Sequence, residues 1–143
     1  MPQILNYKTM TSADFAAVAE ALTQGSLVCL PTDTVYGIAC LPARSAAVKR
    51  IYEVKGRGFD KPLSLVFHDT KQLYRLIPSL PAPLKEALDA LLPGPVTAIV
   101  PVYGGELSGM GLLRGNSAGI RVIPLPLCEL YRQLPAPLGL TSA

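Results

Sequence analysis

The apolar residues of this chain alternate between helical spacing and short continuous runs. After Thr11 they follow the helical spacing of three and four residues, at Phe15, Val18, Ala19 and Leu22. Thr11 and Asp14 have the spacing of a capping box, and Gly25 suits a helix end, so we expect the first helix between them. The apolar run 26–30 that follows predicts a buried strand.

The same alternation continues through the rest of the chain. Short apolar runs predict further strands at residues 38–41, 63–67, 97–102, 119–123 and 138–141. Helical spacing predicts further helices at residues 45–55, 84–92 and 127–134. In the second of these helices we expect one apolar stripe, formed by Leu84, Ala87, Leu88, Leu91 and Leu92. The glycine-rich segment 103–119 predicts a loop, and His68 with Asp69 indicates a turn.

Alternating strands and helices favour a layered α/β domain, and the composition agrees with one such unit over residues 1–143. Half of the residues are hydrophobic and 16% are charged, which excludes disorder driven by charge. A spanning helix needs about 20 mostly apolar residues, and the longest uncharged stretch, 90–105, contains three prolines. The cysteines at 29, 40 and 128 have no CxxC spacing, so we expect free thiols and a reducing, cytoplasmic location.

Positive charge is concentrated in one part of the chain. Residues 44–61 include six basic and two acidic residues, although the net charge of the whole chain is only +3. Within this stretch, Lys55, Arg57 and Lys61 surround a predicted helix end. Arg binds two phosphate oxygens at once and Lys provides a point charge, so the segment suits a triphosphate or a pyrophosphate. A solvated helix face, or cations that complement a helix dipole, would produce a similar pattern.

Other chemistry is limited by what the sequence lacks. His68 is the only histidine, which excludes a metal site built on paired histidines and disfavours a Ser-His-Asp triad. There is no GxxxxGK[ST] phosphate loop, so a nucleotide site would depend on side-chain cations. The turn after the first strand presents Thr32, Asp33 and Thr34, two hydroxyls and a carboxylate. Such residues often only stabilise a turn through their own backbone.

Five segments stand in a characteristic order: LPTDTVYGIA at 30–39, RIYEVKGRGFDKPLSLV at 50–66, PGPVT at 93–97, GIRVIP at 119–124 and LTSA at 140–143. Together they resemble the motifs of the YrdC-like family of threonylcarbamoyl-AMP synthases. The resemblance implies a twisted mixed sheet flanked by helices, with a concave, positively charged face. The sequence stops at Ala143, where the asparagine of the family's Ser-Ala-Asn element would follow. We therefore expect most of a family domain, without its C-terminal part.

The resemblance also implies an activity, the formation of threonylcarbamoyl-AMP and pyrophosphate from L-threonine, bicarbonate and ATP, with Mg²⁺ accompanying ATP. The implied threonine-binding residues are Thr32, Thr34 and Arg121, the last for the threonine carboxylate or a phosphate. The implied ATP-binding residues are Lys55, Arg57, Lys61 and Ser142, and the implied catalytic residues are Lys55, Arg57 and Ser142. We expect Arg57 in an exposed loop, with the cations and the two threonine hydroxyls facing one hollow.

These residue types suit the reaction. An N-carboxylated threonine is already anionic and can attack the α-phosphorus of ATP without a strong base, so that alignment and charge neutralisation are what the protein must supply. The product would then pass to proteins that modify the adenosine beside the anticodon of tRNAs. Two alternatives stay open: a non-catalytic module that binds RNA or tRNA, and a carbamoyl-transfer relative with another acceptor.

Overall fold

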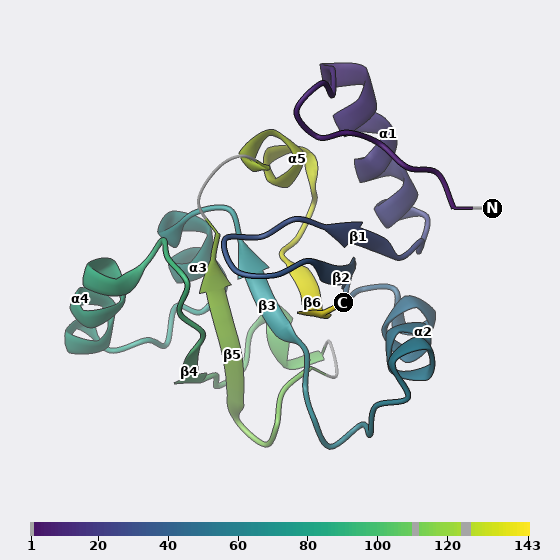
Figure 1. Cartoon of the computed structure of the whole chain (residues 1–143). Coiled ribbons are helices and arrows are strands. Elements are labelled where there is room, and N and C mark those ends of the chain that lie inside the picture. Colours follow the sequence, from purple (N-terminus) through teal and green to yellow (C-terminus); the bar gives the residue numbers. More distant parts are fainter. Residues whose placement is uncertain (1, 110–111, 124–126) are drawn as a thin grey trace.

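The computed structural model describes residues 2–109, 112–123 and 127–143, and its centre is a six-stranded mixed sheet (Figure 1). The strands are β1 (Val28–Leu30), β2 (Gly37–Cys40), β3 (Ser64–Phe67), β4 (Ala98–Pro101), β5 (Ser117–Val122) and β6 (Leu138–Ser142). They lie in the order β1-β2-β6-β3-β5-β4. Neighbouring strands are antiparallel except β3 and β5, which run parallel. The predicted α/β domain with a mixed sheet is confirmed.

Helices cover both faces of this sheet. They are α1 (Ser12–Thr23), α2 (Ser45–Lys55), α3 (Thr70–Leu76), α4 (Ala82–Leu91) and α5 (Cys128–Gln133), with a 3₁₀ helix, η1, at Glu106–Gly109. One core cluster joins α2, α3 and α4 to the sheet, and a second joins α1 and α5 to its other face. In Figure 1, α1 and α5 lie side by side at the top. None of the helices in the described residues has the length and apolar character needed to cross a membrane.

The first helix begins as its sequence predicts. The Thr11 hydroxyl accepts a hydrogen bond from the Asp14 backbone at 3.3 Å, and the Asp14 carboxylate accepts one from the Thr11 backbone at 2.7 Å. These bonds lower the pKa of Asp14, because both the backbone and the hydroxyl of Thr11 donate to its carboxylate. The reciprocal bonds form a capping box, so α1 starts at Ser12.

Two predicted elements form, but their side chains are less buried than expected. The strand expected in the core is β1, which pairs only with β2 and so forms an edge of the sheet, where Cys29 is exposed. In α4 the apolar stripe is narrower than expected, because Ala87 is exposed and Leu91 is 51% exposed, whereas Leu88 is buried. Apolar spacing alone could not indicate that α4 contacts the core along only one row of side chains.

Two segments predicted as irregular are helical or extended in part. Asp69 does not simply form a turn, since its carboxylate accepts a hydrogen bond from the Gln72 backbone at 2.7 Å and caps α3. The glycine-rich segment 103–119 contains η1 and the first residues of β5. Both helices are short, seven and four residues, so their apolar spacing is too brief to be distinctive.

One part of the sheet is left uncovered by α1 and α5. On this part Ile99 of β4 pairs with Gly119 of β5, and Ile99 is 70% exposed. Arg121 follows two residues after Gly119 and therefore shares its face of the sheet. In Figure 1 the segment 31–36, between β1 and β2, runs in front of β3 on this side. The uncovered face and this segment form the setting of the candidate site.

Candidate functional site

Arg121 is the centre of a polar group beneath the segment 31–36. Its Nη2 donates to the Asp33 carboxylate at 2.5 Å and approaches the Thr34 hydroxyl at 3.5 Å. The two charged side chains are only 12% and 14% exposed. An ion pair so shielded from solvent interacts more strongly than one at the surface. The structure therefore brings together Thr34 and Arg121, both expected in the threonine pocket, and adds Asp33 to them.

Thr32 has a different position in the same segment. Its hydroxyl donates to the Val35 carbonyl and accepts from the Thr34 backbone at 3.1 Å, and it also lies 3.2 Å from the Thr34 hydroxyl. These are the local bonds by which a threonine stabilises a turn. Thr32 thus shapes the segment, and Thr34 presents its hydroxyl toward Arg121.

Two buried donors, one on Arg121 itself and one on a residue of α5, have no hydrogen-bond partner among the residues that the structure describes. They are the Nε of Arg121 and the hydroxyl of Tyr131, a residue of α5 that is 3% exposed. The pKa of Tyr131 is raised to about 12, mainly by burial, with the charge of Arg121 lowering it and that of Asp33 raising it. A third unpartnered atom, Nδ1 of His68, follows the end of β3.

The basic segment, residues 55–61 with Lys55, Arg57 and Lys61, starts where α2 ends. Gly56 has a φ of 56°, in the left-handed region that favours glycine, and this lets the chain leave the helix. Arg57 then donates from Nε to the Lys61 carbonyl at 3.1 Å, from Nη2 to the Pro62 carbonyl at 3.3 Å, and from Nη1 to the Thr141 hydroxyl at 2.6 Å. Arg57 does lie in a loop whose neighbouring residues 56 and 58–61 are exposed, but these bonds hold its own side chain half-buried against β6.

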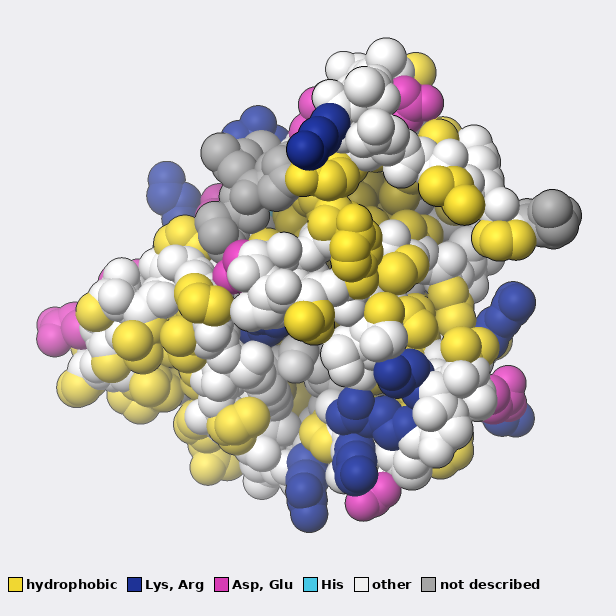
Figure 2. All heavy atoms as spheres, in the orientation of Figure 1, with side chains coloured by type: hydrophobic (Ala, Val, Ile, Leu, Met, Phe, Trp, Pro, Cys, Tyr) yellow, Lys and Arg dark blue, Asp and Glu magenta, His cyan; other side chains and the backbone are white. Residues whose placement is uncertain are grey.

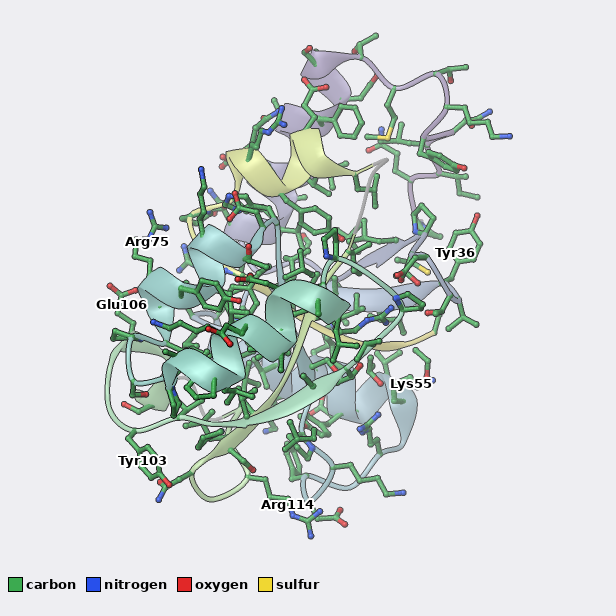
Figure 3. All side chains as sticks on the ribbon, turned by 90° about the vertical axis from the view of Figure 1, so that its left-hand side faces the viewer. Tyr36, Lys55, Arg75, Tyr103, Glu106 and Arg114 are labelled. Atoms are coloured by element: carbon green, nitrogen blue, oxygen red, sulfur yellow. The ribbon has the colours of Figure 1, made fainter. Side chains whose placement is uncertain are left out.

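The two lysines of the segment are more open. Lys61 is exposed and Lys55 is half-buried, and neither ammonium group has a hydrogen bond or ion pair within the described part of the chain. Figure 2 shows Lys and Arg side chains gathered on the lower part of the face, over the segment that joins α2 to β3. In Figure 3, Lys55 and Tyr36 lie on the same side of the molecule. Lys55 and the segment 31–36 therefore share one side in this view. Contrary to the expectation, Arg57 does not face the same hollow as Thr34, because Thr141, to which it bonds, is on the opposite face of the sheet from Arg121.

The end of β6 lies between the Arg121 group and Arg57 with its hydrogen-bond partners. Thr141 pairs with Ile38 and Ser142 with Gly37, so the two hydroxyl residues lie on opposite faces of the sheet. Thr141 bonds Arg57, and Ser142 is exposed beside the segment 31–36. The backbone of Ala143 also donates to the Tyr36 carbonyl at 2.8 Å. No hydrogen bond joins the Arg121 group directly to the Arg57 group in residues 2–109, 112–123 and 127–143.

The site is an open face and not a closed cavity. Two hollows of about 360 and 470 Å³ lie elsewhere on the surface, and none of the predicted site residues lines either of them. The first is lined in part by Arg75 and Glu106, which in Figure 3 lie on the side opposite Lys55. The candidate site is therefore defined by the hydrogen bonds and charges described above, and not by a cavity.

Sequence reasoning missed three residues of this face. Asp33 was noted as a carboxylate but not paired with Arg121, which is 88 positions away. Thr141 and Tyr131 were not proposed at all. Thr141 could have been suspected from its place inside the LTSA segment, directly before Ser142. Nothing in the sequence indicates Tyr131, because its approach to Arg121 depends on how α5 packs over the sheet.

The possible metal ligands and the thiols of the described residues are not gathered into one site. Within residues 2–109, 112–123 and 127–143 there is no group of three or more His, Cys, Asp or Glu side chains that could hold a metal ion. Cys29 and Cys40 are free thiols, as expected, and burial raises the pKa of the Cys40 thiol to about 12. The prediction for Cys128 concerns a side chain outside the described part of the structure.

Known proteins resemble this chain over most of its length. It is 37% identical to the threonylcarbamoyl-AMP synthase of Mus musculus and 44% identical to that of Homo sapiens, over 93% of the chain in both cases. It covers 46% and 47% of those proteins, so it spans about half the length of these relatives. The crystal structure of P. abyssi Sua5 complexed with L-threonine is 27% identical, with a TM-score of 0.79 over 93% of this chain and 39% of that one.

A family model matches the chain as well. It is the Sua5/YciO/YrdC model, whose description reads "Telomere recombination", and it covers residues 20–143. This range includes the segment 31–36, the basic segment after α2, and the end of β6. The match extends over far more than half of the sequence, and the similar proteins named above are threonylcarbamoyl-AMP synthases and a Sua5 structure. The chain therefore belongs to the Sua5/YciO/YrdC family.

Proposed function

We propose that the chain forms threonylcarbamoyl-AMP and pyrophosphate from L-threonine, bicarbonate and ATP. The observation that carries this proposal is that the end of β6 lies between the two groups, with Thr141 bonded to Arg57 on one face of the sheet and Ser142 beside the segment 31–36 on the other. An amino acid and a nucleotide can then be bound close to each other. The mouse and human relatives named for this activity are about twice as long as the chain, so the activity is a proposal for this chain.

The amino-acid end of the site would be the Arg121 group. A guanidinium recognises a carboxylate through charge-assisted hydrogen bonds, and the Arg121 side chain is only 12% exposed, so that such bonds are strong. The Thr34 hydroxyl, 3.5 Å from Arg121, is positioned to bond the amino acid as well. A P. abyssi relative has been crystallised with L-threonine, which supports this choice of amino acid.

The nucleotide end would be the basic segment. The ammonium groups of Lys55 and Lys61, which have no partner among the described residues, would bind the phosphates of ATP, which enters with Mg²⁺ as part of the substrate. Arg57 would hold the segment against β6 and present its remaining edge to the phosphates. Ser142, exposed on the other side of the same strand, would lie between nucleotide and amino acid.

The chemistry then needs few further groups. Threonine that has captured carbon dioxide on its amine carries a carboxylate whose oxygen attacks the α-phosphorus of ATP. The bond between that phosphorus and the bridging oxygen breaks, and pyrophosphate leaves with the electron pair. Fixed cations that neutralise the developing charge and align the two substrates lower the barrier. In the cytoplasm the product would serve the proteins that transfer the threonylcarbamoyl group to tRNA.

Pyrophosphate release provides the test. We expect the purified chain, given ATP and Mg²⁺, to release pyrophosphate only when L-threonine and bicarbonate are both present, with threonylcarbamoyl-AMP detected by mass spectrometry. ATP turnover that is indifferent to threonine would refute the proposal. Tight tRNA binding by a chain with no affinity for ATP would instead favour a non-catalytic RNA-binding role, and release driven by another acceptor would favour a carbamoyl-transfer relative.

Thr34→Val serves as the matched variant. Valine keeps the shape of the side chain but removes the hydroxyl beside Arg121. We expect weaker threonine binding with unchanged ATP binding, since the basic segment is not altered. An equal loss of both affinities would show that Thr34 is not part of the threonine pocket.

A further inference from the structure

Arg121 and Tyr131 present hydrogen-bond donors that the protein itself does not use. Nε of Arg121 and the hydroxyl of Tyr131 are both buried and without a partner among the described residues. A buried donor left without an acceptor costs about 1–3 kcal/mol, so two of them at one place are uncommon in a structure shaped only for stability. Such a pair points to an acceptor that binds from outside.

The fold brings the two groups to the same face of the sheet. Arg121 pairs with Val66 across β3 and β5, and Val66 belongs to the core cluster that contains Tyr131. The side chain of Tyr131 comes from α5, which covers this face, and 97% of it is shielded from solvent. Tyr131 and Arg121 thus face the same side of the sheet, and the charges of Arg121 and Asp33 both act on the Tyr131 hydroxyl.

Asp33 satisfies Arg121 only in part. Its carboxylate accepts a hydrogen bond from Nη2 and leaves Nε free, although a carboxylate can bind both nitrogens of one guanidinium edge. Asp33 lies on the segment 31–36, whose residues 33–36 are exposed, although its side chain is only 14% exposed. A second carboxylate that took this edge would meet Nε, Nη2 and the Tyr131 hydroxyl together.

We propose that Tyr131 is a further substrate-binding residue, whose hydroxyl donates to the amino-acid carboxylate when that carboxylate replaces Asp33 on Arg121. This inference rests on the proposed function, because it takes an amino acid as the occupant of the Arg121 group. Asp33 then occupies the site in the free protein with a carboxylate of its own. The entering carboxylate gains two hydrogen bonds that Asp33 does not make.

The test compares two hydroxyl deletions by titration calorimetry. Tyr131→Phe is expected to weaken L-threonine binding about tenfold, as the loss of one hydrogen bond to a charged group predicts, with ATP binding unchanged. The control is Tyr74→Phe, which removes a hydroxyl that bonds the Lys85 carbonyl and Asp89, away from the Arg121 group. It should leave both affinities as they are. An unchanged threonine affinity in Tyr131→Phe would overturn the inference.

Thermal unfolding separates this role from a structural one. Because the Tyr131 hydroxyl has no partner in the free protein, Tyr131→Phe should melt at the same temperature as the parent chain or higher. A clear fall would show that the hydroxyl supports the fold instead. Asp33→Asn provides a second variant: removing the competing carboxylate should tighten threonine binding severalfold, and weaker binding would contradict the replacement of Asp33.

The two proposals fail in different ways. A parent chain that binds threonine with the Tyr131 dependence described above, but releases no pyrophosphate, would retain the inference and refute the proposed reaction. If the parent chain releases pyrophosphate and Tyr131→Phe binds threonine as tightly as the parent does, the proposed reaction is retained and the role of Tyr131 is refuted. L-Threoninol, which lacks the carboxylate, should bind the parent and Tyr131→Phe chains alike.

Discussion

Arg57 combines support of the fold with spare hydrogen-bonding capacity. It donates three hydrogen bonds within the protein, to the carbonyls of Lys61 and Pro62 and to the Thr141 hydroxyl. Five N–H groups are available on a guanidinium, so part of its capacity remains for a ligand. Lys55 and Lys61 supply charge without such bonds. The resemblance could point to these three residues as a group, but it could not tell which of them also holds the segment in place.

Replacing Arg57 should therefore affect more than ATP binding. We expect Arg57→Ala to raise the ATP dissociation constant, and also to lower the melting temperature, because a hydrogen bond to a charged group contributes about 1.5–3 kcal/mol. Lys55→Ala should weaken ATP binding with little change in melting. Calorimetry and thermal unfolding on the two variants check this. A fully stable Arg57→Ala chain would mean that its bond to Thr141 contributes nothing to the fold.

At the scale of elements, the length of each helix decided whether its apolar spacing could predict it. The helices α1 and α2, of twelve and eleven residues, have clear apolar spacing, and α2 has the predicted bounds. The seven-residue α3 was missed, although Asp69 stands three positions before Gln72, a spacing that suits an N-cap. The order of the strands was beyond the sequence, because β6 inserts between β2 and β3 from the far end of the chain.

The cap of α3 can be tested directly. Asp69→Ala removes the acceptor for the Gln72 backbone and should lower the free energy of unfolding by about 1 kcal/mol, whereas Asp69→Asn should retain most of the stability. Chemical denaturation of both variants measures the difference. Equal losses for alanine and asparagine would assign the effect to charge, since His68 Nε2 lies 3.4 Å from the carboxylate, and not to the cap.

At the scale of the whole molecule, two core clusters lie on the two faces of a single sheet, and each contains a group that ionises only with difficulty. Cys40 belongs to one cluster and Tyr131 to the other, and burial raises both pKa values to about 12. The hydrophobic composition predicted a core, but it could not predict that the core consists of two separate clusters. That division depends on the sheet separating α1 and α5 from the other helices.

Alkaline pH should unfold the protein by ionising these groups. In the unfolded chain the thiol and phenol lose their protons near their ordinary pKa values of 9.0 and 10.0, whereas the folded chain retains them until about 12. The folded state thus binds more protons in this window, and its stability falls as pH rises from about 9 to 12. Denaturation at several pH values checks this, and the decline should be shallower in Tyr131→Phe. Stability that is flat over the window would contradict the burial of both groups.

The register of β6 has a consequence for the whole binding face. Leu140, Thr141 and Ser142 alternate between the two faces, so a slip by one position would place a leucine where Arg57 now meets a hydroxyl. The same slip would move the serine away from the segment 31–36. The contacts on both faces of the sheet would then be lost together, through the misalignment of five residues. Correct pairing of this one strand is thus a condition that folding must meet before the proposed binding of either substrate can occur.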